Sequence, residues 1–183
     1  MNFNPIGPII SFGKTLLSGF SKKHQDSIES DKKLFLEIIS LLPTDGVIKF
    51  INEHDFHSAF RRNKFEELFS FIEKVEGRPG CFFHDSQIEK EFLNLRNSVR
   101  VFLQTLSRNT FPAKNTPDFQ EVTREEEWME INECPFEEAE KIRDAKVKDL
   151  NDSASTTFKI YKRFVENGVN RLKVHVPLNS FWK

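Results

Sequence analysis

Residues 85–108 read DSQIEKEFLNLRNSVRVFLQTLSR, the longest regular apolar pattern in the first two thirds of the chain. Its apolar residues recur at alternating spacings of four and three, which is typical of the buried face of an α-helix. They are Ile88, Phe92, Leu95, Val99, Phe102 and Leu106. Asp85 or Ser86 can cap the start, because a side-chain oxygen there accepts a backbone N–H that has no partner within the helix. We therefore expect a long helix over 85–108 that other helices must cover.

A second long stretch, which begins at Pro135, has the same period. A helix can continue from there to about Glu166, where Asn167–Gly168 is expected to cap it. Its apolar positions are Val147, Leu150, Ala154, Phe158, Tyr161 and Val165. Two long helices of matching period most simply pack antiparallel. We expect Phe92, Leu95, Val99 and Phe102 to be among the most buried residues, facing Leu150, Phe158 and Tyr161.

The remaining periodic stretches predict shorter helices over 31–42, after Thr44, over 60–75 and around Trp128. Residues 109–122 contain Pro112 and Pro117 and are expected to form a loop. No stretch shows the alternation of a β-strand. The predicted fold is therefore all-α, a helical bundle with two long antiparallel helices and an amphipathic N-terminal segment.

Composition narrows the class of protein. The chain has 183 residues, which suits one domain of ordinary size. Cys81 and Cys134 match neither a zinc spacing nor a disulfide framework, so we expect a reducing, cytoplasmic location. The 20 phenylalanines against one tyrosine favour packing over polar recognition by aromatic rings. No cofactor is predicted.

The charge is small overall but unevenly distributed. A net charge of −1 makes nucleic acid an unlikely partner, because non-specific binding to phosphates needs a basic surface. Residues 1–24 carry three lysines and no acid, whereas residues 118–152 carry 13 acids against five bases. This segregation suits polar docking between oppositely charged segments.

The first 24 residues differ from the rest of the chain and are predicted to be a docking segment. Pro8 suits the first position of a short amphipathic helix that ends near Phe20, and a polar linker around 24–30 follows it. The predicted partner-binding residues are Ile9, Ile10, Phe12, Lys14, Leu16, Leu17 and Phe20. The expected domains are this segment (1–24), a helical bundle (25–176) and an irregular tail (177–183).

The N-terminal segment predicts a function based on interaction. The apolar run is too short to span a bilayer, so the expected partner is a protein or a second copy of the chain. An anionic membrane surface is the alternative, because three lysines lie beside the apolar residues. The leading hypothesis is a non-enzymatic helical adaptor.

His54, Asp55 and His57 form a dense group of potential metal ligands. The pair His54–Asp55 resembles the doublet that names the all-helical HD phosphohydrolases. The resemblance implies a metal site that also uses an earlier histidine and a later aspartate, for which His24 and either Asp118 or Asp144 are available. A plain turn, in which Asp55 accepts backbone N–H groups, is the other interpretation.

Two further resemblances involve short motifs. Arg78 and His84 stand six residues apart, which resembles the arginine–histidine motif of the all-helical HEPN ribonucleases and implies RNA cleavage in a dimer cleft. The phrase from Leu41 to Gly46, with Phe50 and residues 54–56, resembles a group of small bacterial helical proteins. That resemblance implies a helical cytosolic domain that follows a membrane-seeking N-terminal segment. It does not imply any activity.

Overall fold

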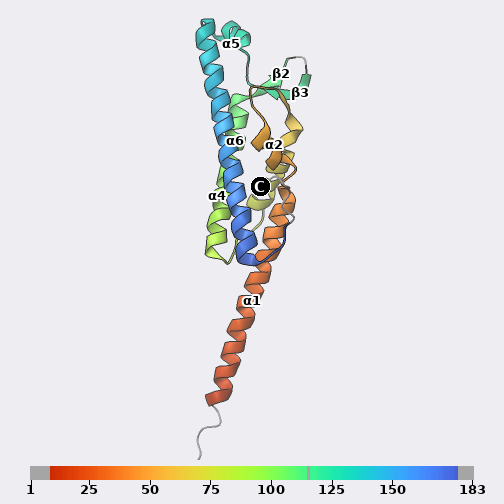
Figure 1. Cartoon of the computed structure of the whole chain (residues 1–183), viewed down its shortest axis with the longest axis vertical. Coiled ribbons are helices and arrows are strands. Elements are labelled where there is room, and N and C mark those ends of the chain that lie inside the picture. Colours follow the sequence, from red (N-terminus) through yellow and green to blue (C-terminus); the bar gives the residue numbers. More distant parts are fainter. Residues whose placement is uncertain (1–8, 115, 177–183) are drawn as a thin grey trace, which may run out of the picture.

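A computed structural model describes residues 9–114 and 116–176, with side chains from His24 onward (Figure 1). The described chain is 72% helical, with six α-helices and a small three-stranded sheet. The helices are α1 (Ile9–Leu41), α2 (Val47–Glu53), α3 (Glu66–Glu76), α4 (Ser86–Asn109), α5 (Glu125–Asn132) and α6 (Phe136–Leu172). The predicted helical character is therefore right, and the expectation that the chain has no strands is wrong.

The helix α4 forms where its sequence pattern predicts it. Asp85 is its N-cap, and the carboxylate accepts the backbone N–H groups of Gln87 at 2.9 Å and Ile88 at 3.1 Å. The side chains expected in the core are all 0% exposed: Phe92, Leu95, Val99 and Phe102. The apolar face of α4 therefore forms the centre of the hydrophobic core.

The helix α6 covers α4 along most of its length. Three polar contacts join them: Asp85 with Arg171 at 2.7 Å, Glu91 with Arg163 at 2.7 Å, and Ser98 with Thr157 at 2.8 Å. Along α4 the contacting residues run from 85 to 98, and their partners on α6 run from 171 back to 157. Two of the three side chains expected to face α4 are buried, Leu150 and Tyr161, whereas Phe158 is partly exposed.

The predicted end of α6 is wrong. The helix continues through Asn167 and Gly168 to Leu172 and ends at Lys173, whose φ of 55° is left-handed. Gly168 lies against α1, and a Cβ atom at this position would stand 2.0 Å from Cε2 of Phe35. The glycine therefore permits close approach of two helices and does not cap one.

The predicted polar linker over 24–30 is also wrong, because α1 is one helix from Ile9 to Leu41. Its C-terminal half belongs to the core through Phe35 and Ile38. Asp31, 3% exposed, accepts the backbone N–H groups of His84 and Asp85, both at 2.8 Å. The N-terminal half of α1 extends beyond the bundle, away from α5 (Figure 1).

Residues 60–75, expected as one helix, form three elements. They are β1 (Phe60–Arg61), a 3-10 turn (Arg62–Phe65) and α3, which ends at Gly77 as predicted. The short helix α2 has Gly46 as its N-cap, and not Thr44. Its first N–H, from Val47, is satisfied by the Glu67 carboxylate of α3 at 2.7 Å. The Glu67 side chain, 20 residues later in the sequence, therefore accepts the hydrogen bond that a local N-cap side chain would normally accept.

Residues 109–122, expected as a loop, contain two strands, β2 (Phe111–Ala113) and β3 (Thr116–Glu121). The sheet has the order β1-β3-β2, and both pairings are antiparallel. Phe60 pairs with Gln120, and Phe111 with Glu121. The sheet therefore joins the start of α3 to the segment after α4.

Candidate functional site

The predicted docking residues lie on the part of α1 that extends beyond the bundle. Residues 9–23 span about 22 Å of helix at 1.5 Å per residue. The backbone of the seven predicted residues is helical, and their side chains lie outside the described part of the structure: Ile9, Ile10, Phe12, Lys14, Leu16, Leu17 and Phe20. The structure thus presents the segment as a continuation of a core helix.

The histidine–aspartate group lies in the turn after α2. Asp55 accepts the backbone N–H of His57 at 3.1 Å and the amide of Asn151, on α6, at 3.1 Å. The Asn151 amide, followed by hydrogen bonds from His57, lowers the pKa of Asp55 to about 2. These contacts match the turn interpretation, in which Asp55 accepts backbone hydrogen bonds.

The two histidines face different partners. His54 lies 3.2 Å from the Ser58 carbonyl through Nε2 and stacks on Phe50, with ring centroids 4.6 Å apart. Burial lowers the pKa of His54. His57 lies between Asp55 (3.0 Å) and Asp144 (3.6 Å). Within residues 24–114 and 116–176, no three His, Cys, Asp or Glu side chains are grouped in a way that could hold a metal ion.

Arg78 and His84 make different kinds of contact, Arg78 through its side chain and His84 through its backbone N–H and its ring. Both carboxylate oxygens of Glu37, on α1, accept hydrogen bonds from Nη1 of Arg78 at 2.8 Å. The backbone N–H of His84 donates to Asp31, while its ring packs against Phe82 with centroids 5.2 Å apart. Both residues therefore help to fix the α3–α4 connection to α1.

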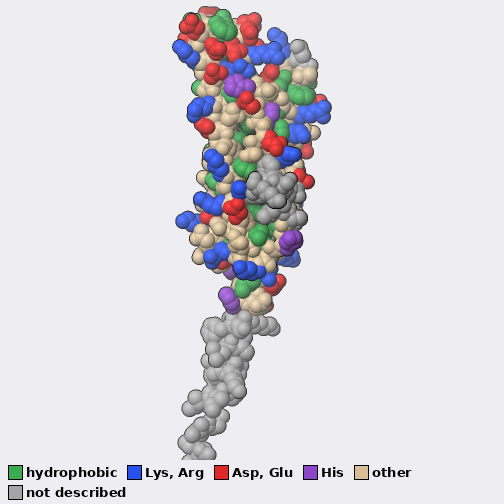
Figure 2. Space-filling view, viewed as in Figure 1, with side chains coloured by type: hydrophobic (Ala, Val, Ile, Leu, Met, Phe, Trp, Pro, Cys, Tyr) green, Lys and Arg blue, Asp and Glu red, His purple; other side chains and the backbone are tan. Residues whose placement is uncertain are grey.

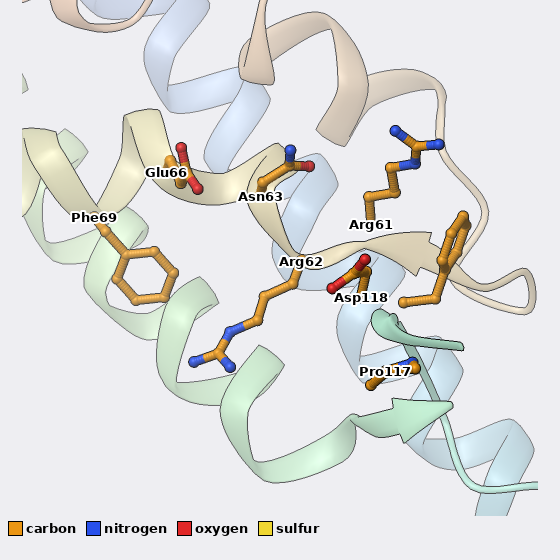
Figure 3. A pocket seen from close by; sticks show the side chains of 8 residues that line it. Arg61, Arg62, Asn63, Glu66, Phe69, Pro117 and Asp118 are labelled. Atoms are coloured by element: carbon orange, nitrogen blue, oxygen red, sulfur yellow. The ribbon is translucent and has the colours of Figure 1, made fainter. Parts of the chain in front are cut away.

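A surface hollow of about 770 Å³ lies beside the sheet (Figure 3). Its lining comes from β1 and the 3-10 turn, from α3 and from β3: Arg61, Arg62, Asn63, Glu66, Phe69, Pro117, Asp118 and Phe119. In Figure 3 the Arg61 and Arg62 side chains point to opposite sides, with Asp118 between them. Arg61 lies over the Phe119 ring at 5.6 Å. The hollow therefore offers both charges without a convergent anion site.

A smaller hollow of about 280 Å³ shares Arg62 and Phe69 with the first. Its other apolar lining residues are Phe60, Phe65, Leu103, Leu106 and Pro112. Phe69 is 53% exposed at the border of the two hollows. This slot can receive an apolar side chain, but its lining offers no group arranged for chemistry.

The turn between α5 and α6 carries a different surface, which we call the α5 end (residues 124–141). Ile131 is 71% exposed and Phe136 is 49% exposed, and no residue of α5 is buried. Figure 2 shows acidic side chains around hydrophobic ones at this end of the molecule. The sequence indicated the acidity, whereas the exposure of two large apolar side chains followed only from the structure.

Two contacts position the α5 end on the bundle. Glu125 accepts a hydrogen bond from Arg143 of α6 at 2.6 Å. The ammonium of Lys146 lies 4.2 Å from the Trp128 ring centroid and 5.9 Å from that of Phe111. These contacts hold the inner side of α5 and leave its outer side facing solvent.

Comparisons with known proteins add no family to this description. No family model, no curated protein and no solved structure matches the chain. None of the helices in the described ranges 9–114 and 116–176 is long and apolar enough to cross a membrane.

Proposed function

We propose that the chain is a non-enzymatic interaction protein that docks through the N-terminal part of α1. In this proposal α4 and α6 form an antiparallel pair that holds the C-terminal half of α1, and residues 9–23 are presented to a protein partner. The observation that carries the proposal is the continuity of α1 from the core to its extension beyond the bundle (Figure 1).

Energetics support this arrangement. Each large apolar side chain left in water forgoes about 1.5–3 kcal/mol of burial free energy, so a partner that covers several of them gains substantially. An isolated helix of about 15 residues is marginal in water, because the first turn is costly to form. A helix that already has a folded C-terminal half avoids that cost, and its N-terminal half is therefore organised before it binds.

A protein partner fits better than a membrane. Each basic residue near an anionic surface contributes about 1 kcal/mol, and three lysines beside one short apolar face bind lipid only weakly. A protein groove can bury the same apolar face more completely. We also propose a reducing intracellular location, because Cys81 and Cys134 are unbridged.

The two enzymatic hypotheses rank lower. His54 faces the Ser58 carbonyl and Phe50, whereas a metal site of the HD type would need it to join Asp55 on an ion. Arg78 is held by Glu37, whereas an RNA-cleaving site of the HEPN type would need it in a cleft with His84. These contacts support the interaction hypothesis over the two enzymatic ones.

The experiment compares two substitutions on opposite sides of residues 9–23. Leu16→Asp places a charge on the apolar side, and Ser18→Asp places the same charge on the polar side. We expect the full-length chain and Ser18→Asp to retain the same partner, measured by quantitative affinity capture and by sedimentation velocity, and Leu16→Asp to lose it. Equal binding by all three proteins would contradict the proposal. Flotation of the full-length chain with anionic liposomes would favour the membrane instead.

A further inference from the structure

The α5 end exposes an apolar face that is rimmed by acids. Ile131 and Phe136 lie on either side of the turn at Glu133, whose left-handed φ of 52° ends α5. Residues 124–141 contain eight acids and two bases. Six of the glutamates are exposed: Glu126, Glu130, Glu133, Glu137, Glu138 and Glu140. An apolar face with an acidic rim suits a segment that has apolar and basic side chains and no acid.

The chain itself contains such a segment. Residues 1–24 have three lysines, no acid and a cluster of large apolar residues. Lys14 lies within the helical stretch, and Lys22 and Lys23 lie near the point where it meets the bundle. The two surfaces therefore match in both hydrophobicity and charge.

Within one molecule these two surfaces lie at opposite ends. Asp31 of α1 contacts the backbone of Asp85, and Asp85 pairs with Arg171 near the end of α6. The α5 end is fixed to the start of α6 through Glu125 and Arg143. The 37 residues of α6 span about 55 Å, and α1 leads away from the α5 end (Figure 1). A segment of the same molecule cannot reach this surface.

We infer that the N-terminal part of α1 of one molecule docks on the α5 end of a second copy. This inference rests on the proposed function, since it names the partner of the same segment. The two contacting surfaces differ, so the contact is heterologous and leaves one docking segment and one α5 end unoccupied in every dimer. Association therefore continues end to end, and it weakens with salt because part of the attraction is electrostatic.

The first experiment uses the thiol of Cys134, which is partly exposed in the α5–α6 turn. Ser18→Cys is placed in a Cys81→Ser background, and a short bismaleimide reagent is added to the full-length chain. We expect covalent dimers and higher species, analysed by mass spectrometry for a link between positions 18 and 134. The same protein with Cys134→Ser in addition keeps only the thiol at position 18 and should lose the cross-linked dimer as well as the higher species. Links that join only two copies of position 18 or two copies of position 134, without an 18–134 link, would overturn the proposed contact.

The second experiment separates the two surfaces. Leu16→Asp removes the docking segment and keeps the α5 end, whereas Ile131→Asp does the reverse. Each variant alone should be monomeric by sedimentation velocity, with its association constant reduced by about tenfold or more. Their equimolar mixture should form dimers that do not grow, because the free segment of each dimer then carries Leu16→Asp and its free α5 end carries Ile131→Asp. Val101→Asp, at a side chain 46% exposed on α4, is the matched control and should associate like the parent.

The outcomes distinguish the inference from the proposed function. If Leu16→Asp loses association with every partner while Ile131→Asp associates like the parent, the segment docks elsewhere and only this inference fails. If neither substitution changes any association, both fail. A parent chain that stays monomeric at all concentrations, or a mixture that forms no dimers, also overturns this inference.

Discussion

The helix α6 passes through two regions that differ in how they are held. In its middle, Leu150, Ala154 and Tyr161 are buried against the rest of the core, and the Tyr161 hydroxyl donates to the Leu42 carbonyl at 2.6 Å. In its first turn, Phe136 is 49% exposed beside an α5 without buried residues. The fold therefore depends on the middle of α6, whereas the start of α6 is available as a surface.

Polar contacts follow the same division. In the middle, Thr157 (0% exposed) and Ser98 (7% exposed) share a hydrogen bond of 2.8 Å, and burial raises the pKa of Tyr161. At the α5 end, the Glu125–Arg143 pair and the Lys146 ammonium, which lies near the Trp128 and Phe111 rings, connect α5 to α6 and are partly exposed to solvent. We therefore expect local opening of the molecule to begin at the α5 end.

The largest effect should come from the middle of the core. Phe102 is 0% exposed, and its ring centroid lies 5.5 Å from that of Phe65 and 6.0 Å from that of Phe56. Phe102→Ala should lower the free energy of unfolding by about 3–5 kcal/mol, measured by urea denaturation, because it leaves a cavity. Val101→Ala is the control next to it and should change stability by about 0.5 kcal/mol or less. A loss below about 1 kcal/mol for Phe102→Ala would place this residue outside the core.

A second effect concerns the contact between α6 and α1. An alanine in place of glycine normally stabilises a helix by about 0.8–1 kcal/mol. At Gly168 the added Cβ would meet the Phe35 ring at 2.0 Å, so Gly168→Ala should instead destabilise the protein by about 1–3 kcal/mol. A smaller ring partner, Phe35→Leu, should reduce that penalty in the double variant, measured by thermal unfolding. A stabilised Gly168→Ala protein would show that the two helices are farther apart.

The N-cap of α4 should have an intermediate effect that depends on pH. Burial opposes the charge of Asp85, but hydrogen bonds from Arg171 and from the backbone of Ile88 and Gln87 outweigh it and lower the pKa of Asp85. The carboxylate therefore stabilises the fold above its usual pKa of 3.8, and this contribution is lost as the pH falls through the lower pKa of the folded state. Asp85→Ala should cost about 0.5–2 kcal/mol at neutral pH.

Two measurements check this prediction. The stability difference between the parent and Asp85→Ala should shrink when urea denaturation is repeated in acid, because the parent then loses the same charge. Asp85→Asn is the matched control, since asparagine also caps helices but carries no charge that could form an ion pair with Arg171. A difference that stays constant with pH would assign the effect to the shape of the cap alone.

A helix could be predicted from the sequence where its apolar period and its cap residues, which are local, agree with the way the helix packs against distant parts of the chain. The bounds of α4 follow from its apolar period and from Asp85, and both are local. The end of α6 could not be predicted in this way, because Gly168 reads locally as a cap while Phe35 of α1 determines its role. Residues 24–30 read locally as a polar linker, but they form a solvent-facing part of α1 and need no apolar period.

The sheet could not be predicted from local alternation. The residues of β2 and β3 are mostly exposed, so their sequence shows no buried face, and both strands contain proline. The third strand of the sheet, β1, pairs with β3 from about 60 residues earlier in the chain and is itself only two residues long. The sequence distinguishes residues 1–24 by their composition, whereas it does not show the exposure of Ile131 and Phe136, because that exposure depends on how α5 leaves the bundle.

The smallest effect on stability should come from the α5 end, where the exposed side chains contribute little to the core. Ile131→Asp replaces a large apolar side chain that is 71% exposed, so little burial free energy is lost, and we expect a change of about 0.5 kcal/mol or less by urea denaturation. Ile88→Asp makes the same chemical change at a side chain that is 0% exposed in α4 and should prevent stable folding, because it buries an unpaired charge. If Ile131→Asp were instead strongly destabilising, the α5 end would belong to the core, and its loss of association would report unfolding. A nearly unchanged stability makes any loss of association a property of the surface itself.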